Sequence, residues 1–140
     1  MKIVLAADGS DCTKKALAFL VSHEALAGAD DEVFVLNVQT PLPPSVALMV
    51  SSEAANGSHR DEANKVLDPI RVFLDRHPIR YRCEWVVGSP AAEIVEASRR
   101  EKARMIVMGT HGRGLLGRVL MGSVAQRVVA DCDVPVLLVK

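Results

Sequence analysis

The sequence lacks an excess of charge of either sign: its 140 residues include 17 Lys plus Arg and 17 Asp plus Glu. A chain without net positive charge has no overall field that attracts nucleic acid, so we expect no nucleic-acid partner. Long apolar runs are also missing. The first apolar run, residues 3–7, stops at Asp8, far short of a membrane span or a secretory leader. We therefore expect neither membrane association nor a signal peptide.

Cysteine is scarce, with three residues at Cys12, Cys83 and Cys132. An odd number without a CxxC pair argues against a disulfide framework and against a thiolate zinc site. The four histidines show no HxxxH or HxH spacing, so we expect no metal site. Reduced thiols are typical of a cytoplasmic protein, which is the location we expect. Cys12 falls in the first turn of a predicted helix.

Aromatic residues are rare as well, at 4% of a chain that is 49% hydrophobic. Most of the apolar content is Val, Ala and Leu, which is typical of a buried parallel sheet covered by helices. The length is near that of one domain with its own core. No repeat or composition change divides the chain, so we predict a single domain over residues 1–140.

Apolar runs alternate with helical patterns along the whole chain. The predicted strands are residues 2–7, 32–38, 79–87, 103–108 and 134–139, and the predicted helices are residues 10 to about 27, 58–77, 89–100 and from 123 onward. This order requires right-handed crossovers and a parallel α/β sheet, in which ligands bind at the carboxyl ends of the strands. Asp8 and Gly109 then lie on one sheet edge, and they share one crevice if the first and fourth strands are neighbours.

Several local signals refine these elements. Ser10 and Ser89 are predicted helix N-caps, and Gly28 is a predicted C-cap. Residues 41–57 are predicted to be a loop, with residues 46–50 as a short helix or a lid. Pro69 falls inside the third helical pattern and is expected to kink or split that helix.

The most informative stretch is residues 105–126, a buried strand followed by a glycine-rich segment and a new helix at Ser123. Glycine lets backbone N–H groups wrap a phosphate, and a helix N-terminus adds unpaired donors with a positive dipole end. This pattern predicts a nucleotide phosphate site. A P-loop is excluded, because Leu115 stands where that motif requires Lys.

Two further phosphate motifs fit the glycine segment. A dinucleotide motif, GxGxxG, is present from Gly112 to Gly117, but no acidic residue follows at the ribose-binding position. The second is G-x2-G-x9-G-[ST], formed by Gly109, Gly112, Gly122 and Ser123. This spacing resembles that of the ATP-binding universal stress proteins. The resemblance extends over the full length, in IVLAADGS (3–10), GSPAAEIVEAS (88–98), VMGTHGRG (107–114), GSVAQRVV (122–129) and VPVLLVK (134–140).

The resemblance implies a flavodoxin-like (Rossmann-like) three-layer sandwich with a five-stranded parallel sheet in the order 3-2-1-4-5. It also implies ATP, with or without Mg²⁺, as the ligand. The residues expected to contact it are Ala7, Asp8, Val38, Met108, Gly109, Gly112, Arg113, Gly114, Gly122, Ser123 and Val124. The chain departs from the family at Arg104, where Asp is more usual, and at Asp133, where Cys is common.

Each expected contact has an alternative role. Asp8 accepts from the adenine amino group or the ribose, or it bonds its own turn. Val38 and Met108 sandwich the adenine, or they only pack in the core. Ser123 donates to a phosphate, or it caps its helix in a capping box with Gln126.

The glycines at 109, 112 and 122 are expected to donate backbone N–H groups to the phosphates, with simple turn geometry as their alternative. The side chains of Arg113, Arg118 and His111 fit either phosphate pairing or solvent exposure.

The glycine segment shows no general base, activated nucleophile or carboxylate pair for Mg²⁺. We therefore expect a nucleotide-binding stress-response or regulatory module, with at most slow ATP hydrolysis or autophosphorylation. The alternatives are an ATP-hydrolysing or adenylyl-transferring enzyme, and a nucleotide-free interaction protein. The apolar last strand, at a predicted sheet edge, predicts a homodimer joined through that edge.

Overall fold

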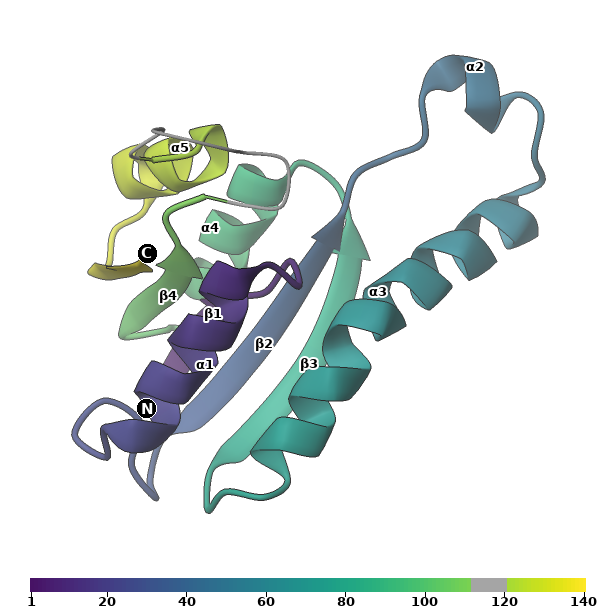
Figure 1. The fold of residues 1–140 in the computed structure, drawn as a ribbon. Helices are drawn as coiled ribbons and strands as arrows, with labels where there is room; N and C mark the ends of the chain where they lie inside the picture. Colours follow the sequence, from purple (N-terminus) through teal and green to yellow (C-terminus); the bar gives the residue numbers. More distant parts are fainter. Residues whose placement is uncertain (112–120) are drawn as a thin grey trace.

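Strands and helices alternate along the chain in the computed structural model, which describes residues 1–111 and 121–140 (Figure 1). The strands are β1 (Lys2–Ala6), β2 (Glu32–Gln39), β3 (Arg80–Val87), β4 (Met105–Gly109) and β5 (Val136–Val139). The helices are α1 (Asp11–Ser22), α2 (Pro44–Ala47), α3 (Ser52–Leu74), α4 (Pro90–Arg100) and α5 (Ser123–Asp131). The predicted order of strands and long helices is confirmed.

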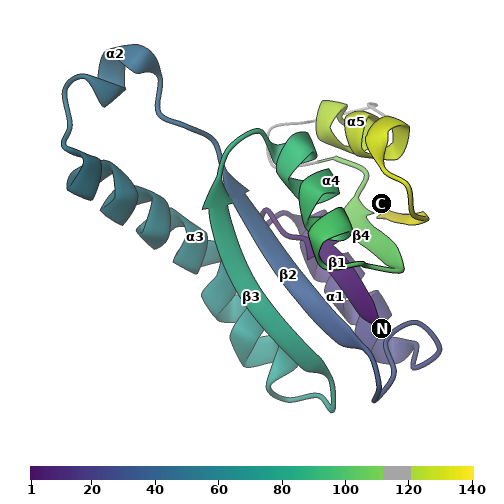
Figure 2. The same cartoon turned by 180° about the vertical axis from the view of Figure 1, so that it is seen from behind.

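The strands form one parallel sheet in the order β3-β2-β1-β4-β5, as predicted. Helices α1 and α3 cover one face, and α4 and α5 cover the other, which Figures 1 and 2 show from opposite sides. The order in which strands are added to the sheet switches sides at β1, because β2 and β3 lie on one side of β1 while β4 and β5 lie on the other. That point is where α/β sheets of this kind hold their ligands.

The core has two halves because successive strand side chains point to opposite faces. On β1, Ile3 and Leu5 pack toward α1 and α3, whereas Val4 packs toward α4 and α5. On β2, Phe34 and Leu36 belong to the α4–α5 side. Strands buried on both faces account for the continuous apolar runs of the sequence.

Helix α1 ends at Ser22, so the predictions of a helix to about residue 27 and of a Gly28 C-cap are wrong. The His23 amide donates to the Leu20 carbonyl at 3.3 Å, and the chain then turns. Arg104, at the start of β4, donates to the Leu26 carbonyl and forms an ion pair with Asp31 at 3.3 Å. This contact from a distant strand holds residues 24–31 outside the helix.

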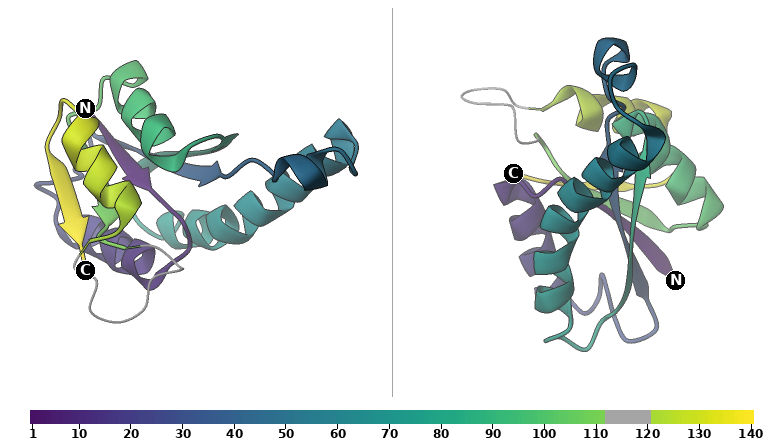
Figure 3. Two further views of the ribbon diagram at one scale, coloured as in Figure 1. Left: turned by 90° about the horizontal axis from the view of Figure 1, so that it is seen from above. Right: turned by 90° about the vertical axis from the view of Figure 1, so that its right-hand side faces the viewer.

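Helix α2 and the first part of α3 form an arm that projects from the sheet, whereas the second half of α3 packs on it (Figure 3). The prediction of a loop up to residue 57 is wrong, because α3 already begins at Ser52, with the Ser51 hydroxyl accepting from the Ala54 amide at 3.1 Å. A short helix is present in this region as α2, but at Pro44–Ala47 rather than at the predicted residues 46–50. Pro69 does not split α3, which continues through it. At the tip of the arm, Leu48 and Met49 are 90% and 84% exposed.

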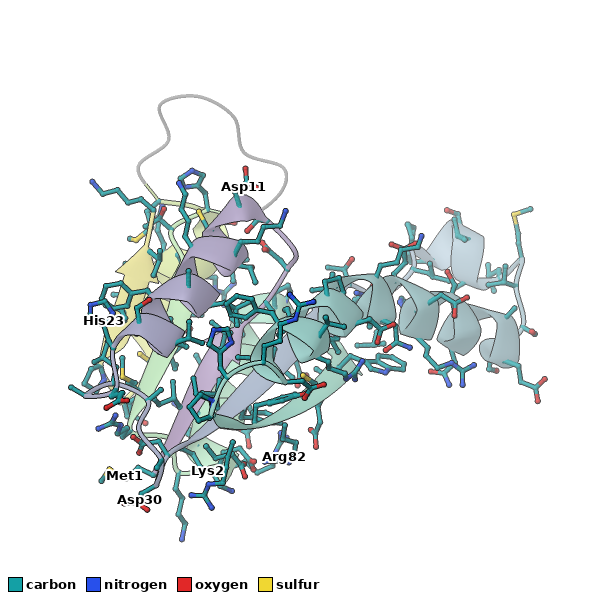
Figure 4. The ribbon with its side chains drawn as sticks, turned by 60° about the horizontal axis from the view of Figure 1, so that its bottom comes forward. Met1, Lys2, Asp11, His23, Asp30 and Arg82 are labelled. Carbon is teal, nitrogen blue, oxygen red and sulfur yellow. The ribbon has the colours of Figure 1, made fainter. Side chains whose placement is uncertain are left out.

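Charged side chains gather at the amino ends of the strands, the end opposite to the site described below. Figure 4 shows Met1, Lys2, Asp30 and Arg82 together there, with Asp11 at the other end of the molecule. Arg82 lies over the Phe34 ring at 4.4 Å and pairs with Glu101. No described helix is long and apolar enough to cross a membrane.

Candidate functional site

A cavity of about 270 Å³ lies at the carboxyl ends of β1 and β4, where the strand order reverses. Its walls come from β1, β2, β4 and the first turns of α1, α4 and α5. The lining residues are Ala6, Ala7, Asp8, Thr13, Leu36, Val38, Pro90, Ile94, Met108, Gly109, Thr110, His111, Gly122, Ser123, Val124 and Ala125. Strands β1 and β4 pair directly, so Asp8 and Gly109 lie at the same crevice, as their positions in the sequence predict.

The structure brings most of the expected contact residues together in this cavity. Those that line it are Ala7, Asp8, Val38, Met108, Gly109, Gly122, Ser123 and Val124. The other three, Gly112, Arg113 and Gly114, lie outside the described residues, as does Arg118. His111 also lines the cavity. Residues from both ends of the sequence therefore surround one space.

Asp8 forms the turn between β1 and α1. Its Oδ1 atom accepts from the Ser10 amide and from the Thr13 hydroxyl, each at 2.9 Å. The turn role weighed for this residue is therefore present. Within the described part of the chain, the second carboxylate oxygen, Oδ2, has no hydrogen-bond partner. Asp8 thus keeps one acceptor for a ligand in the cavity.

A buried amide supports the end of β1 from the side of β2. The Asn37 side chain, 3% exposed, donates to the Ala7 carbonyl at 2.8 Å. Its own oxygen accepts from the Gln39 amide group at 2.7 Å. Asn37 therefore fixes the backbone immediately before Asp8, and no sequence motif marked it for this role.

Much of the cavity lining is apolar. Leu36, Val38 and Ile94 line it together with Met108, which is 5% exposed. Ala6 and Ala7 contribute small side chains that leave room between these walls. A flat apolar ring fits such a space better than a charged group does, because the walls offer no partners for charge.

Gly109 has a packing reason to be glycine. A Cβ atom at this position would lie 2.3 Å from Cβ of Cys12, far closer than atoms can approach. The first turn of α1 therefore packs directly on the end of β4. This close approach differs from both roles considered for Gly109 in the sequence, phosphate donor and turn former. It also buries Cys12, which is 6% exposed.

Helix α5 begins at the cavity, and its N-cap is Gly122 rather than Ser123. The capping box predicted for Ser123 and Gln126 is therefore wrong: no side chain caps this helix, and the Gln126 side chain donates to the Met121 carbonyl at 3.0 Å. The Gly122 amide donates to the Thr110 carbonyl at 2.6 Å. This bond ties the helix start to β4, so the Gly122 amide is engaged within the protein.

The first amides of α5 remain as donors. Ser123 and Val124 are the first two helical residues, and helix geometry gives their N–H groups no partner within the helix. The Ser123 hydroxyl is likewise unbonded among the described residues. Unpaired amides, a hydroxyl and the positive end of the helix dipole together favour an anion at this end of the cavity.

The sequence reasoning missed several wall residues. Pro90 and Ile94 come from the first turns of α4, and Thr13 comes from α1. Thr110 is 7% exposed, and its hydroxyl lies 2.8 Å from Nδ1 of His111. Pro90, Ile94 and Thr110 lie in stretches that resemble the family, but no spacing rule assigned them to the site. The one sequence signal for these residues is that they lie near the start of a predicted helix or the end of a predicted strand, and the carboxyl ends of the strands form the site.

The described residues give the cavity an acceptor at Asp8, apolar walls, and donors at the start of α5. They contain no group of three or more His, Cys, Asp or Glu side chains able to hold a metal ion. The arrangement is therefore suited to bind a ligand with a donor-bearing planar ring and an anionic tail.

The family model described as "Universal stress protein family" matches this chain over residues 1–140. Universal stress protein MJ0531 of Methanocaldococcus jannaschii is 35% identical over 99% of this chain and 81% of its own length. The solved structure of MJ0577, from the same organism, is 30% identical and superposes with a TM-score of 0.84. That match covers 99% of this chain and 94% of the other.

A second solved structure is that of the universal stress protein from Archaeoglobus fulgidus in complex with dAMP. It is 25% identical, has a TM-score of 0.68, and the match covers 100% of this chain and 98% of the other. That relative therefore binds an adenine nucleotide on a fold similar to this one.

Proposed function

Because this chain belongs to the universal stress protein family, we propose that it binds an adenine nucleotide in the cavity between β1 and β4. ATP is the proposed ligand, with or without Mg²⁺. The observation that carries the proposal is that one cavity combines a free carboxylate oxygen of Asp8 with the start of helix α5. Binding of dAMP by the Archaeoglobus relative supports it.

The acceptor at Asp8 and the donors at the start of α5 suit different parts of a nucleotide. Asp8 carries negative charge, which repels phosphate and attracts a donor, so the adenosine belongs at β1. Val38 and Met108 then lie against the adenine ring. The phosphates belong at Ser123 and Val124, where the amides of α5 are unpaired.

We propose that the protein is a cytoplasmic stress-response or regulatory module rather than an enzyme. The described residues of the cavity pair one hydroxyl, that of the buried Thr110, with the His111 imidazole, and they supply no second carboxylate beside Asp8. A group of that kind is what phosphoryl transfer with Mg²⁺ requires. Slow ATP hydrolysis or autophosphorylation is the most turnover expected, and steady-state measurement of phosphate release tests this part.

The binding proposal is tested in two steps. The purified protein is first denatured, and any released nucleotide is identified by mass spectrometry. The nucleotide-free protein is then titrated with ATP by calorimetry, with and without Mg²⁺. Saturable binding is expected. The proposal is wrong if the wild-type protein binds no adenine nucleotide under either condition.

A charge variant locates the phosphates. Ser123→Asp places a carboxylate at the start of α5, where the helix dipole tolerates it but a phosphate does not. We expect the affinity for ATP to fall on the order of tenfold or more. The matched control is Gln126→Glu, which adds the same charge to the same helix at a residue outside the cavity lining. Equal losses in both variants would place the phosphates elsewhere.

We also propose a homodimer joined through β5. This strand pairs only with β4 among the described elements, which leaves its other edge open. Its residues are Val136, Leu137, Leu138 and Val139, and an open apolar edge of this kind readily pairs with a second copy. Light scattering is expected to give twice the chain mass of 15.1 kDa. A monomer at micromolar concentration would contradict the dimer.

A further inference from the structure

A buried threonine hydroxyl is bonded twice to Asp8, the acidic residue of the cavity. Thr13 lies in the first turn of α1 and is 3% exposed. Its Oγ1 donates to Oδ1 of Asp8 at 2.9 Å and accepts from the Asp8 amide at 3.2 Å. The two bonds connect the side chain and the backbone of one residue through a single hydroxyl.

The two carboxylate oxygens of Asp8 differ in their hydrogen bonding. Oδ1 accepts from the Thr13 hydroxyl and also from the Ser10 amide at 2.9 Å. Oδ2 has no partner in residues 1–111 and 121–140, and Asp8 lines the cavity. The carboxylate therefore offers Oδ2 as an acceptor for a ligand. The hydrogen bonds to Oδ1 set the position of Oδ2.

The backbone before Asp8 is already fixed from β2. The Ala7 amide donates to the Leu36 carbonyl at 2.9 Å, and the Ala7 carbonyl accepts from the Asn37 side chain at 2.8 Å. What remains adjustable is the rotation of the Asp8 carboxylate. The two donors to Oδ1 restrict that rotation, and only one of them, the Thr13 hydroxyl, comes from a side chain.

We propose that Thr13 is a positioning residue for ligand recognition, which orients Asp8 so that Oδ2 accepts from the adenosine part of the nucleotide. The inference rests on the proposed function and adds a role for a residue outside the glycine motif. Since Thr13 acts through Asp8, its contribution to affinity requires the Asp8 carboxylate to be present.

A double-mutant cycle tests this dependence. ATP is titrated by calorimetry into the full-length wild type, Thr13→Val, Asp8→Ala and the double variant. We expect Thr13→Val to weaken binding on the order of tenfold when Asp8 is present. In the Asp8→Ala background, the same change is expected to alter affinity by less than about twofold. A loss that is equal in the two backgrounds would overturn the inference.

Two further variants separate positioning from general damage to the fold. Thr13→Ser keeps the hydroxyl and is expected to retain affinity close to that of the wild type. A loss as large as that of Thr13→Val would overturn the inference. Thr110→Val removes another buried hydroxyl of the cavity that does not contact Asp8. Its effect is expected to add to that of Asp8→Ala, and coupling as strong as that of Thr13 would also overturn the inference.

The cycle also distinguishes this inference from the proposed function. If the wild type binds no adenine nucleotide, the proposed function fails and the inference fails with it. If the wild type binds and the cycle is additive, nucleotide binding stands and the role of Thr13 is wrong. Thermal unfolding of each variant shows that the titrated protein is folded.

Discussion

Gly109 and Cys12 are packed so closely that no side chain fits at position 109: an added Cβ would lie 2.3 Å from Cβ of Cys12. The contact joins the end of β4 to the first turn of α1, two of the elements that form the cavity. Because the contact leaves no room for a side chain, we expect a larger residue at position 109 to destabilise the fold.

Gly109→Ala is expected to lower the free energy of unfolding by about 1–3 kcal/mol, the usual cost of overpacking a buried contact. Gly88→Ala is the control, since the atoms nearest to its added Cβ belong to the flexible Glu93 side chain. That control is expected to change stability by less than about 0.5 kcal/mol. Urea unfolding measures both. A Gly109→Ala protein as stable as the wild type would show that α1 shifts freely.

Cys12→Gly removes the Cβ atom that Gly109→Ala would meet. The double variant is therefore expected to lose less stability than the sum of the two single variants, because the clash exists only when both Cβ atoms are present. The same unfolding measurement gives the coupling. Additive losses would mean that the close approach does not limit residue 109.

Ser123→Ala is expected to leave the unfolding free energy within about 0.5 kcal/mol of the wild type, because Ser123 does not cap α5. Ser10→Ala is the comparison, since the Ser10 hydroxyl accepts from the Thr13 amide and caps α1. Loss of that cap is expected to cost about 1 kcal/mol. Under the proposed function, Ser123→Ala still weakens ATP binding. Equal destabilisation by the two changes would restore the capping role of Ser123.

Tyr81 is the only tyrosine, and its hydroxyl donates to Oδ1 of Asp75 at 2.5 Å. This bond, with burial and the Asp75 charge, raises the pKa of Tyr81 to about 12 from an ordinary 10.0. The bond holds the proton in the folded state, so its contribution to stability is complete below pH 10 and is lost as the pH rises toward 12.

Phenolate absorbance measures this titration directly. The folded protein is expected to titrate near 12 and the urea-unfolded protein near 10. Asp75→Ala is expected to lower the pKa of Tyr81 in the folded protein toward the unfolded value. Trp85 fluorescence reports whether the protein is still folded at each pH. A folded-state transition near 10 in the wild type would contradict the hydrogen bond.

Arg104 connects the start of β4 to the turn before β2. Burial pushes the pKa of Asp31 upward, but the Gly28 amide, the Arg104 guanidinium and the N-terminal amino group together outweigh it and hold the pKa below 3.8. Arg104→Met keeps the bulk of the side chain and removes these bonds, so it is expected to cost about 1–2 kcal/mol at neutral pH.

The pH dependence of this loss follows from the sign of the shift. A lowered carboxyl pKa contributes stability above the ordinary value of 3.8, and this contribution is lost as the pH falls through the folded-state pKa. The difference between wild type and Arg104→Met is therefore expected to shrink below pH 3.8. Arg99→Met is the control, since its ion pair with Asp133 is exposed and is expected to be worth less than about 1 kcal/mol.

The sequence by itself determined the order of strands and helices and the place of the cavity. Buried parallel strands show as continuous apolar runs, and this signal is local. Asp8 and Gly109 each follow such a run, so the topology alone places them at one edge. The spacing of the glycines and Ser123 indicated the family, because a backbone site for phosphate needs fixed residue types at fixed distances along the chain.

Only the tertiary structure decided the contacts between elements that lie far apart in the sequence. Arg104 holds Leu26 outside α1, a contact that the helical pattern up to residue 27 does not contain. The Gly122 amide bonds to Thr110, which makes Gly122 the N-cap and frees Ser123.

The Asp8–Thr13 pair and the wall residues Pro90 and Ile94 also belong to the tertiary structure. The physical reason is common to all of them. Propensity and periodicity act over a few residues, whereas these hydrogen bonds and contacts exist only once the sheet has brought its strand ends and helix starts together.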